Sequence, residues 1–198
     1  MKNILVVIAV LTFISCKHDF VDKDLIAYNC YNENDTLIFQ SSKAVADSFV
    51  IAKKEIKNYG WDENKGLYNP PTAIIYSQHL PYRQYSHHTT GDDNIRDEVT
   101  FMTIYKTNPN DAPREEIYFK DFNGTIEREK QRISGFANPW KEKIIYKVPL
   151  FDLSVARNPE DLIYVYWNDK LGIIGYQCKD GEYWRLVKKM SGPSEVTN

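Results

Sequence analysis

Residues 171–186 read LGIIGYQCKDGEYWRL, in which two apolar and aromatic runs flank Asp180-Gly181. An Asp-Gly pair suits a two-residue type I′ turn, because both central positions of that turn require a positive φ. The stretch therefore predicts a β-hairpin in which Cys178 faces Tyr183. Both predicted faces carry bulky side chains, so the hairpin is expected inside the domain rather than at its rim.

Short runs of apolar, β-branched and aromatic residues recur along the chain, and turn residues separate them. An alternation with a period of two predicts strands, because successive side chains of a strand point to opposite faces. The predicted strands cover residues 25–31, 36–40, 72–77, 99–105, 117–122, 144–148 and 162–167. A second Asn/Asp-Gly pair, Asn123-Gly124, is expected to turn the chain after residues 117–122.

Residues 42–60 fit two different structures. Apolar residues from Val45 to Ile56 fall at helical spacing, whereas residues 47–51 form a β-rich run after a turn. We favour the strand, and a helix over residues 43–58 is the alternative. The predicted fold class is therefore mainly β, as an antiparallel sandwich or an open barrel with at most one helix.

The first fifteen residues have the pattern of an export signal. Lys2 supplies a positive charge, and residues 4–14 are apolar apart from one threonine. This stretch falls short of the roughly 20 apolar residues that span a bilayer. Residues 13–16, Phe-Ile-Ser-Cys, follow directly and resemble the lipobox of bacterial lipoproteins. The resemblance implies cleavage before Cys16, a diacylglyceryl group on its sulfur and acylation of the new amino terminus.

These features predict the organisation of the whole chain. Removing residues 1–15 from the 198-residue chain leaves 183 residues, near the size at which one hydrophobic core is the norm. We expect a signal peptide over 1–15, a polar tether over 16–24, a single β-rich domain over 25–190 and a tail over 191–198. The lipid anchor places the domain on a membrane of the bacterial envelope, expected to be the outer membrane, where it faces the periplasm or the exterior.

The composition argues against several classes of function. Lys and Arg number 25 and Asp and Glu 27, without a long run of one sign, so nucleic acid is not an expected partner. The sequence has no Gly-x-Ser-x-Gly and no Gly-rich loop before a helix. No cofactor is therefore expected, and nothing singles out a nucleophile or an acid and base pair.

The two ends of the domain carry distinctive motifs: DTLIFQSS at 35–42 with DSFVI at 47–51, and GIIGY at 172–176 with DGEYWRL at 180–186. This set of motifs resembles uncharacterised lipoproteins of Bacteroidota. The resemblance implies an antiparallel β architecture and an envelope location. It implies no catalytic residue, because these motifs are chiefly structural.

Two cysteines, Cys30 and Cys178, remain once Cys16 is assigned to lipid. An oxidising compartment permits a disulfide between them. Two separately buried thiols are the alternative, because a free cysteine behaves as a small hydrophobic residue. The sequence leaves both open.

Residues 58–96 hold many aromatic and imidazole groups among Pro and Gly, so much of this stretch is expected to be loop. Its aromatic rings would serve as flat platforms for a glycan or as anchors for a protein. The candidate ligand-binding residues are Trp61, Tyr68, Tyr82 and Tyr85, with Arg83 to fix polar groups.

The same stretch offers a candidate metal site. His79, His87 and Asp92 would form a His/His/carboxylate set with an open position, in which His88 or Asp93 could replace a neighbour. The spacing fits no zinc motif, so solvated loop residues are the simpler interpretation.

Three functions follow as hypotheses. The first is a non-catalytic module that binds a protein or a glycan. The second is a metal-dependent hydrolase that uses the loop histidines. The third is a structural or protective envelope lipoprotein, such as one that neutralises a neighbour's toxin.

Overall fold

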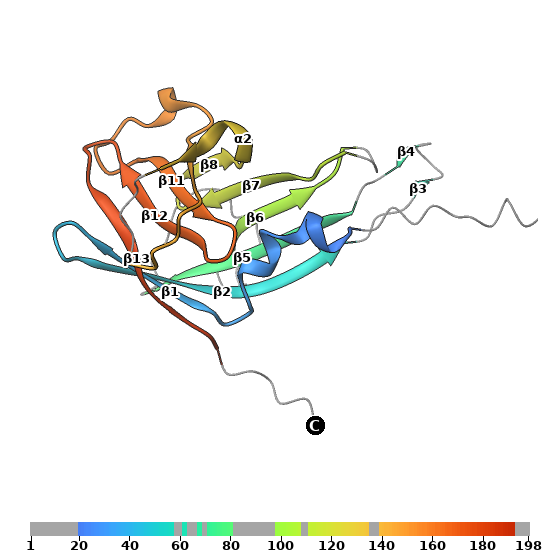
Figure 1. Cartoon of the computed structure of the whole chain (residues 1–198), viewed down its shortest axis with the longest axis horizontal. Helices are drawn as coiled ribbons and strands as arrows, with labels where there is room; N and C mark the ends of the chain where they lie inside the picture. The colour runs from blue at the N-terminus through green and yellow to red at the C-terminus, as the bar shows by residue number, and fades with distance from the viewer. Residues whose placement is uncertain are drawn as a thin grey trace, which may run out of the picture.

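The structure is a computed structural model, which describes residues 20–57, 71–80, 98–107, 111–134 and 139–192, together with the strand backbones at 61–62 and 67–68. Eleven strands form one antiparallel sheet in the order β8-β7-β6-β5-β2-β1-β13-β12-β11-β10-β9. This sheet curls into a half-barrel (Figure 1). The predicted mainly β, antiparallel fold is confirmed, in its open-barrel form.

The strands of the half-barrel are β1 (Thr36–Ser41), β2 (Ala46–Lys57), β5 (Thr72–Leu80), β6 (Val99–Tyr105), β7 (Arg114–Phe119), β8 (Phe122–Thr125), β9 (Arg132–Ile133), β10 (Ile145–Pro149), β11 (Leu162–Asn168), β12 (Gly172–Cys178) and β13 (Tyr183–Met190). A separate pair is formed by β3 (Trp61–Asp62) and β4 (Leu67–Tyr68). The short helices are η1 (Asp22–Leu25), η2 (Tyr28–Cys30), α2 (Arg128–Gln131) and η3 (Leu153–Val155), where η denotes a 3-10 helix.

The ambiguous segment 42–60 contains the strand β2, so the helix alternative is wrong. Phe49 and Ile51 are buried while Val45 and Ile56, two members of the helical pattern, are 53% and 42% exposed. Burial in β2 alternates with a period of two as far as Ile51. The turn before β2 is held by Ser41, whose hydroxyl accepts hydrogen bonds from two backbone N–H groups of the loop.

The predicted strand over 25–31 is also wrong, because η2 and part of η1 occupy it. Ala27, Cys30 and Tyr31 are buried, at 0%, 6% and 0% exposure. Their spacing of three and then one residue belongs to a helical turn rather than to a strand. The two 3-10 helices bury this face against the core of the half-barrel.

The C-terminal hairpin forms, but its register differs by one residue from the prediction. Gln177 pairs with Tyr183, and the N–H of Cys178 donates to Glu182 O at 2.8 Å. The loop therefore has three residues, 179–181, and Gly181 supplies a φ of +88°. Three-residue hairpin loops combine a type I turn with one left-handed residue, whereas a type I′ turn needs two. A shift by one residue exchanges the faces of a strand.

The second hairpin turns earlier than predicted. Phe119 pairs with Phe122, so Lys120 and Asp121 form the turn and Asn123-Gly124 lies within β8. Lys120 has a φ of 56°. A Cβ on Gly124 would lie 2.7 Å from the backbone oxygen of Pro149. This glycine is therefore needed for the close approach of β8, an edge strand of the curled sheet, to β10.

The half-barrel has two ends. At the first, which we call the entry end, Lys106 follows β6 and its Nζ lies 2.7 Å from Asp24 Oδ2 in η1. Asp24 is 3% exposed, so the predicted tether over 16–24 overlaps the folded region. At the second, which we call the pocket end, β2 begins and β5 ends at Leu80. In Figure 1 the entry end lies to the right and the pocket end to the left.

Aromatic side chains fill the half-barrel between its two ends. Phe119 packs against Phe49 at 4.6 Å, Tyr176 at 5.3 Å and Phe101 at 5.8 Å between ring centroids. Phe39 joins the same cluster. Each fully buried ring of this kind stabilises the fold by roughly 1.5–3 kcal/mol through removal from water. This aromatic cluster lies beneath the pocket end.

Candidate functional site

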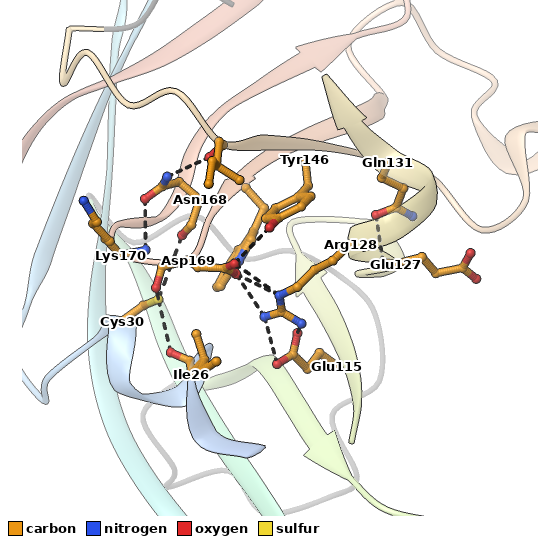
Figure 2. A network of polar contacts seen from close by, with 12 residues as sticks. Ile26, Cys30, Glu115, Glu127, Arg128, Gln131, Tyr146, Asn168, Asp169 and Lys170 are labelled. Atoms are coloured by element: carbon orange, nitrogen blue, oxygen red, sulfur yellow. Dashed lines mark hydrogen bonds and ion pairs between the residues drawn. The ribbon is translucent and has the colours of Figure 1, made fainter. Parts of the chain in front are cut away.

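A partly buried charge cluster lies at the entry end (Figure 2). Arg128 in α2 donates from Nε to Asp169 Oδ1 at 3.0 Å and lies 2.6 Å through Nη1 from Glu115 Oε2. Tyr146 OH and Trp167 Nε1 also donate to the Asp169 carboxylate, each at 3.1 Å. The Arg128 guanidinium therefore connects β7 to the β11–β12 turn, and the Asp169 carboxylate connects that turn to β10.

Glu115 is the most deeply buried charged member of this cluster, with 2% exposure. Burial raises its pKa above the ordinary value, and the nearby Arg128 offsets only part of that effect. A carboxyl with a raised pKa beside a second carboxylate is a pattern found in acid and base catalysis. Here the guanidinium fills the space between the two carboxylates, so the arrangement serves the fold.

The two cysteines of the domain are free and buried. Cys30 Sγ donates to Asp169 O at 3.2 Å, beside the start of β12, whereas Cys178 ends β12. Six residue steps of a strand separate those positions by about 20 Å. Of the two alternatives, the separately buried thiols are observed and the disulfide is not. Burial raises the pKa of Cys30 to about 12 and that of Cys178 to about 11.

The pocket end holds a pocket of about 310 Å³. It lies where β2, β5, β12 and β13 meet the β7–β8 turn and the start of β11. The residues that give it its chemical character are Asp47, His79, Lys120, Leu162, Cys178 and Trp184.

Asp47 is the centre of the pocket floor and is 9% exposed. Its Oδ2 lies 2.6 Å from Lys120 Nζ and accepts a hydrogen bond from Tyr176 OH at 3.0 Å. Its Oδ1 contacts His79 Nε2. Burial alone would raise the pKa of Asp47, but the charge of Lys120 and the hydrogen bonds from Lys120 and His79 lower it overall. Asp47 is therefore a carboxylate at neutral pH.

Lys120 lies between this carboxylate and two aromatic rings. Its Nζ is 4.7 Å from the ring centroid of Tyr176 and 5.3 Å from that of Trp184. Trp184 stacks on Tyr176 with centroids 5.4 Å apart and ring planes 15° apart. The one-residue shift of the C-terminal hairpin places these rings together, because it pairs Tyr176 with Trp184. The opposite charges of Lys120 and Asp47 neutralise each other in the pocket floor.

The rim of the pocket is acidic, with Asp121, Glu160, Asp161 and Glu182. Glu182 is paired with Lys43 at 3.2 Å, and Asp161 accepts backbone N–H groups of its own loop. Asp121 and Glu160 are exposed, and neither has an ion pair within the part of the chain that the structure describes. The rim therefore presents negative charge to the solvent.

The strand β5 separates the candidate residues that the sequence grouped into one loop region. Trp61 and Tyr68 pair through their backbones in β3 and β4, which follow the entry end of β2. Their side chains lie outside the described residues. Tyr82, Arg83, Tyr85, His87 and Asp92, with His88 and Asp93, also lie outside them, after the pocket end of β5.

His79 is the one candidate metal ligand within the described residues, where it contacts Asp47. Among those residues, no three His, Cys, Asp or Glu side chains gather as a metal site would require. His79 instead lies in the pocket wall, with its ring 4.7 Å from the ring of Phe49.

Sequence reasoning missed Asp47, Lys120 and Trp184 as site residues. Asp47 and Lys120 lie in different hairpins, and the register at Asp180-Gly181 was needed to place Trp184. Lys120 carried a weak signal, because it precedes an Asp and follows two consecutive aromatic residues. The Asn123-Gly124 pair is a stronger turn signal, so the turn was predicted there and not at Lys120.

Comparisons with protein-family models, with curated proteins and with solved structures give no match to this chain. None of the helices in the described ranges has the length and apolar character needed to cross a bilayer.

Proposed function

We propose that this chain is a lipid-anchored protein of the bacterial envelope that binds a ligand non-catalytically at its pocket end. The observation that carries the proposal is the arrangement of the two ends. The helices η1 and η2 and the cluster around Arg128 cover the entry end, whereas a pocket with aromatic, cationic and acidic side chains lies at the other.

The position of the predicted anchor supports an orientation. Cys16 precedes Phe20 by four residues, and Phe20 packs against the core beside η1. Four extended residues reach at most about 14 Å. A lipid on Cys16 would therefore hold the entry end near the membrane. The pocket end would then face away from the bilayer, where a ligand can reach it.

Binding is favoured over covalent catalysis by the state of the pocket side chains. Cys178, His79 and Asp47 line the same pocket, a set that resembles a nucleophile with its base. However, burial raises the pKa of Cys178 to about 11, and the charge of Lys120 and the hydrogen bond with Trp184 offset only part of that effect. A neutral thiol is a poor nucleophile. Asp47 already engages Lys120, Tyr176 and His79, so the exposed rim is the part that can receive a ligand.

Site-specific photocrosslinking in intact cells tests this proposal. A photoreactive phenylalanine analogue is placed at Val45 in the pocket wall, and in a matched variant at Ile56, near the other end of β2. We expect a discrete adduct from the Val45 position alone. No adduct from Val45, or the same adduct from both positions, would rule out a ligand site at the pocket end.

A further inference from the structure

The loop between β10 and β11 presents three large apolar side chains to solvent. Phe151 is 77% exposed, Leu153 52% and Val155 56%. They alternate with Asp152 and Ser154 within five residues. The loop stands out from the half-barrel at the upper left of Figure 1. Clustered exposed apolar side chains mark binding surfaces more often than single ones do.

This loop is held in place by hydrogen bonds. Phe151 N–H donates to Asn123 O at 2.8 Å, and Asp152 Oδ1 accepts from Ser154 N–H at 2.9 Å. Lys179 Nζ donates to Ala156 O at 2.7 Å. A fixed loop loses little conformational entropy when a partner covers it, so its apolar side chains can serve as anchors.

The loop leads directly into the rim of the pocket. Asp161 Oδ2 accepts N–H groups from Arg157 at 2.6 Å and from Asn158 at 2.7 Å, which fixes the residues after the apolar segment. Glu160 and Asp161 then line the pocket. The apolar side chains and the rim residues Glu160 and Asp161 therefore belong to one loop.

Charge decides what kind of partner fits this surface. The pocket lining holds five carboxylates, of which Asp47 is paired with Lys120 and Glu182 with Lys43. The exposed Asp121 and Glu160 at the rim have no ion pair within the described residues, so they leave the rim negative. Such a surface attracts cations and repels anions, including anionic lipid headgroups.

We propose that the pocket end docks a polypeptide segment that carries a Lys or Arg side chain next to an apolar one. The basic side chain meets the carboxylates of Asp121 and Glu160 at the rim of the pocket. The apolar side chain packs on Phe151 and Leu153. This inference rests on the proposed function, because it names the partner of the same site.

Fluorescence anisotropy with three labelled ten-residue peptides tests the inference at physiological ionic strength. The probes alternate Arg with Leu, Arg with Ser, and Glu with Leu. We expect the Arg/Leu peptide to bind at least about tenfold more tightly than either other peptide, because both halves of the surface contribute.

Two paired variants locate the binding. Asp121→Asn with Glu160→Gln, and separately Phe151→Ser with Leu153→Ser, should each weaken Arg/Leu binding by about tenfold. The matched controls remove exposed groups away from the pocket: Asp22→Asn with Glu129→Gln, and Ile26→Ser with Ile56→Ser. They should change the affinity by less than about twofold.

Equal losses in the control variants, or equal binding of the Arg/Ser peptide, would overturn the inference, since either result means attraction by net charge alone. Failure of all three peptides, with a Val45 adduct still formed in cells, would overturn the cationic partner and leave the ligand site standing. Loss of both results would remove the proposed function as well.

Discussion

Lys120 Nζ lies 2.6 Å from Asp47 Oδ2, and this ion pair joins the β7–β8 turn to the start of β2 beneath the pocket. The side chains are 15% and 9% exposed. Removing one member of a buried pair leaves the other charge without compensation, which costs more than the pair itself contributes. The pair therefore fixes the shape of the pocket floor.

Lys120→Met should destabilise the protein by about 2–4 kcal/mol, because the Asp47 carboxylate stays buried. The double variant with Asp47→Asn should cost less than the sum of the two single changes. Urea denaturation of the four proteins measures this coupling. Additive costs would show that the two side chains do not depend on each other.

The stability should depend on pH through Asp47. Its pKa is lowered from 3.8 in the folded protein, so its stabilising contribution is present above about pH 4 and is lost as the pH falls through the folded pKa. Asp47→Asn should therefore flatten the acid side of the curve of unfolding free energy against pH. If the slope of unfolding free energy against pH stayed unchanged below pH 4 in this variant, Asp47 would not be an ionised, stabilising group in the pocket floor.

The cluster at the entry end predicts the opposite pH response in a variant. Arg128→Met removes the cation beside Glu115, whose pKa is already raised by burial. The variant should lose about 3–5 kcal/mol at neutral pH. A carboxyl whose pKa is raised in the folded state contributes stability at low pH, and that contribution is lost as the pH rises through the folded pKa. This variant should therefore regain stability on mild acidification. Adding Glu115→Gln should remove that recovery.

Two glycines should differ in their tolerance of a methyl group. A Cβ on Gly181 meets nothing within 4 Å, so Gly181→Ala should cost about 1 kcal/mol from its φ of +88° alone. Gly124→Ala should cost about 2–3 kcal/mol, because its Cβ would meet the Pro149 backbone. Thermal unfolding of both variants shows which one loses more stability. A larger loss for Gly181→Ala than for Gly124→Ala would contradict the β8–β10 contact.

The thiols of Cys30 and Cys178 should be unreactive in the folded protein. Burial and their raised pKa values leave little thiolate to react. Maleimide labelling of mature protein should reach both thiols after unfolding in denaturant without reductant. If reductant were needed before these two thiols could be labelled, a disulfide would be present.

Most strands could be predicted, because each needs only a local alternation of apolar and polar residues. Residues 99–105 were predicted with the bounds that β6 has. The turns could not be placed as well, since Asp180-Gly181 permits a two-residue or a three-residue loop. Residues 25–31 failed for another reason: their burial comes from packing over the end of the half-barrel, which the local pattern does not contain.

The candidate site was less predictable than the fold. It depends on the curvature that brings Asp47, Lys120 and Trp184 to one end, and no local pattern encodes that meeting. The aromatic residues between 58 and 96 form one group by composition, yet the strand β5 (Thr72–Leu80) interrupts that group between Tyr68 and Tyr82.

Both proposals depend on how the anchored protein stands on the membrane, and fluorescence quenching by brominated lipids tests this most directly. Lipidated protein in vesicles carries one fluorophore, either at Ile56 near the entry end or at Val45 at the pocket end. We predict strong quenching at Ile56 and little at Val45. Stronger quenching at Val45 than at Ile56 would mean that the pocket faces the bilayer, and it would contradict the proposed binding surface.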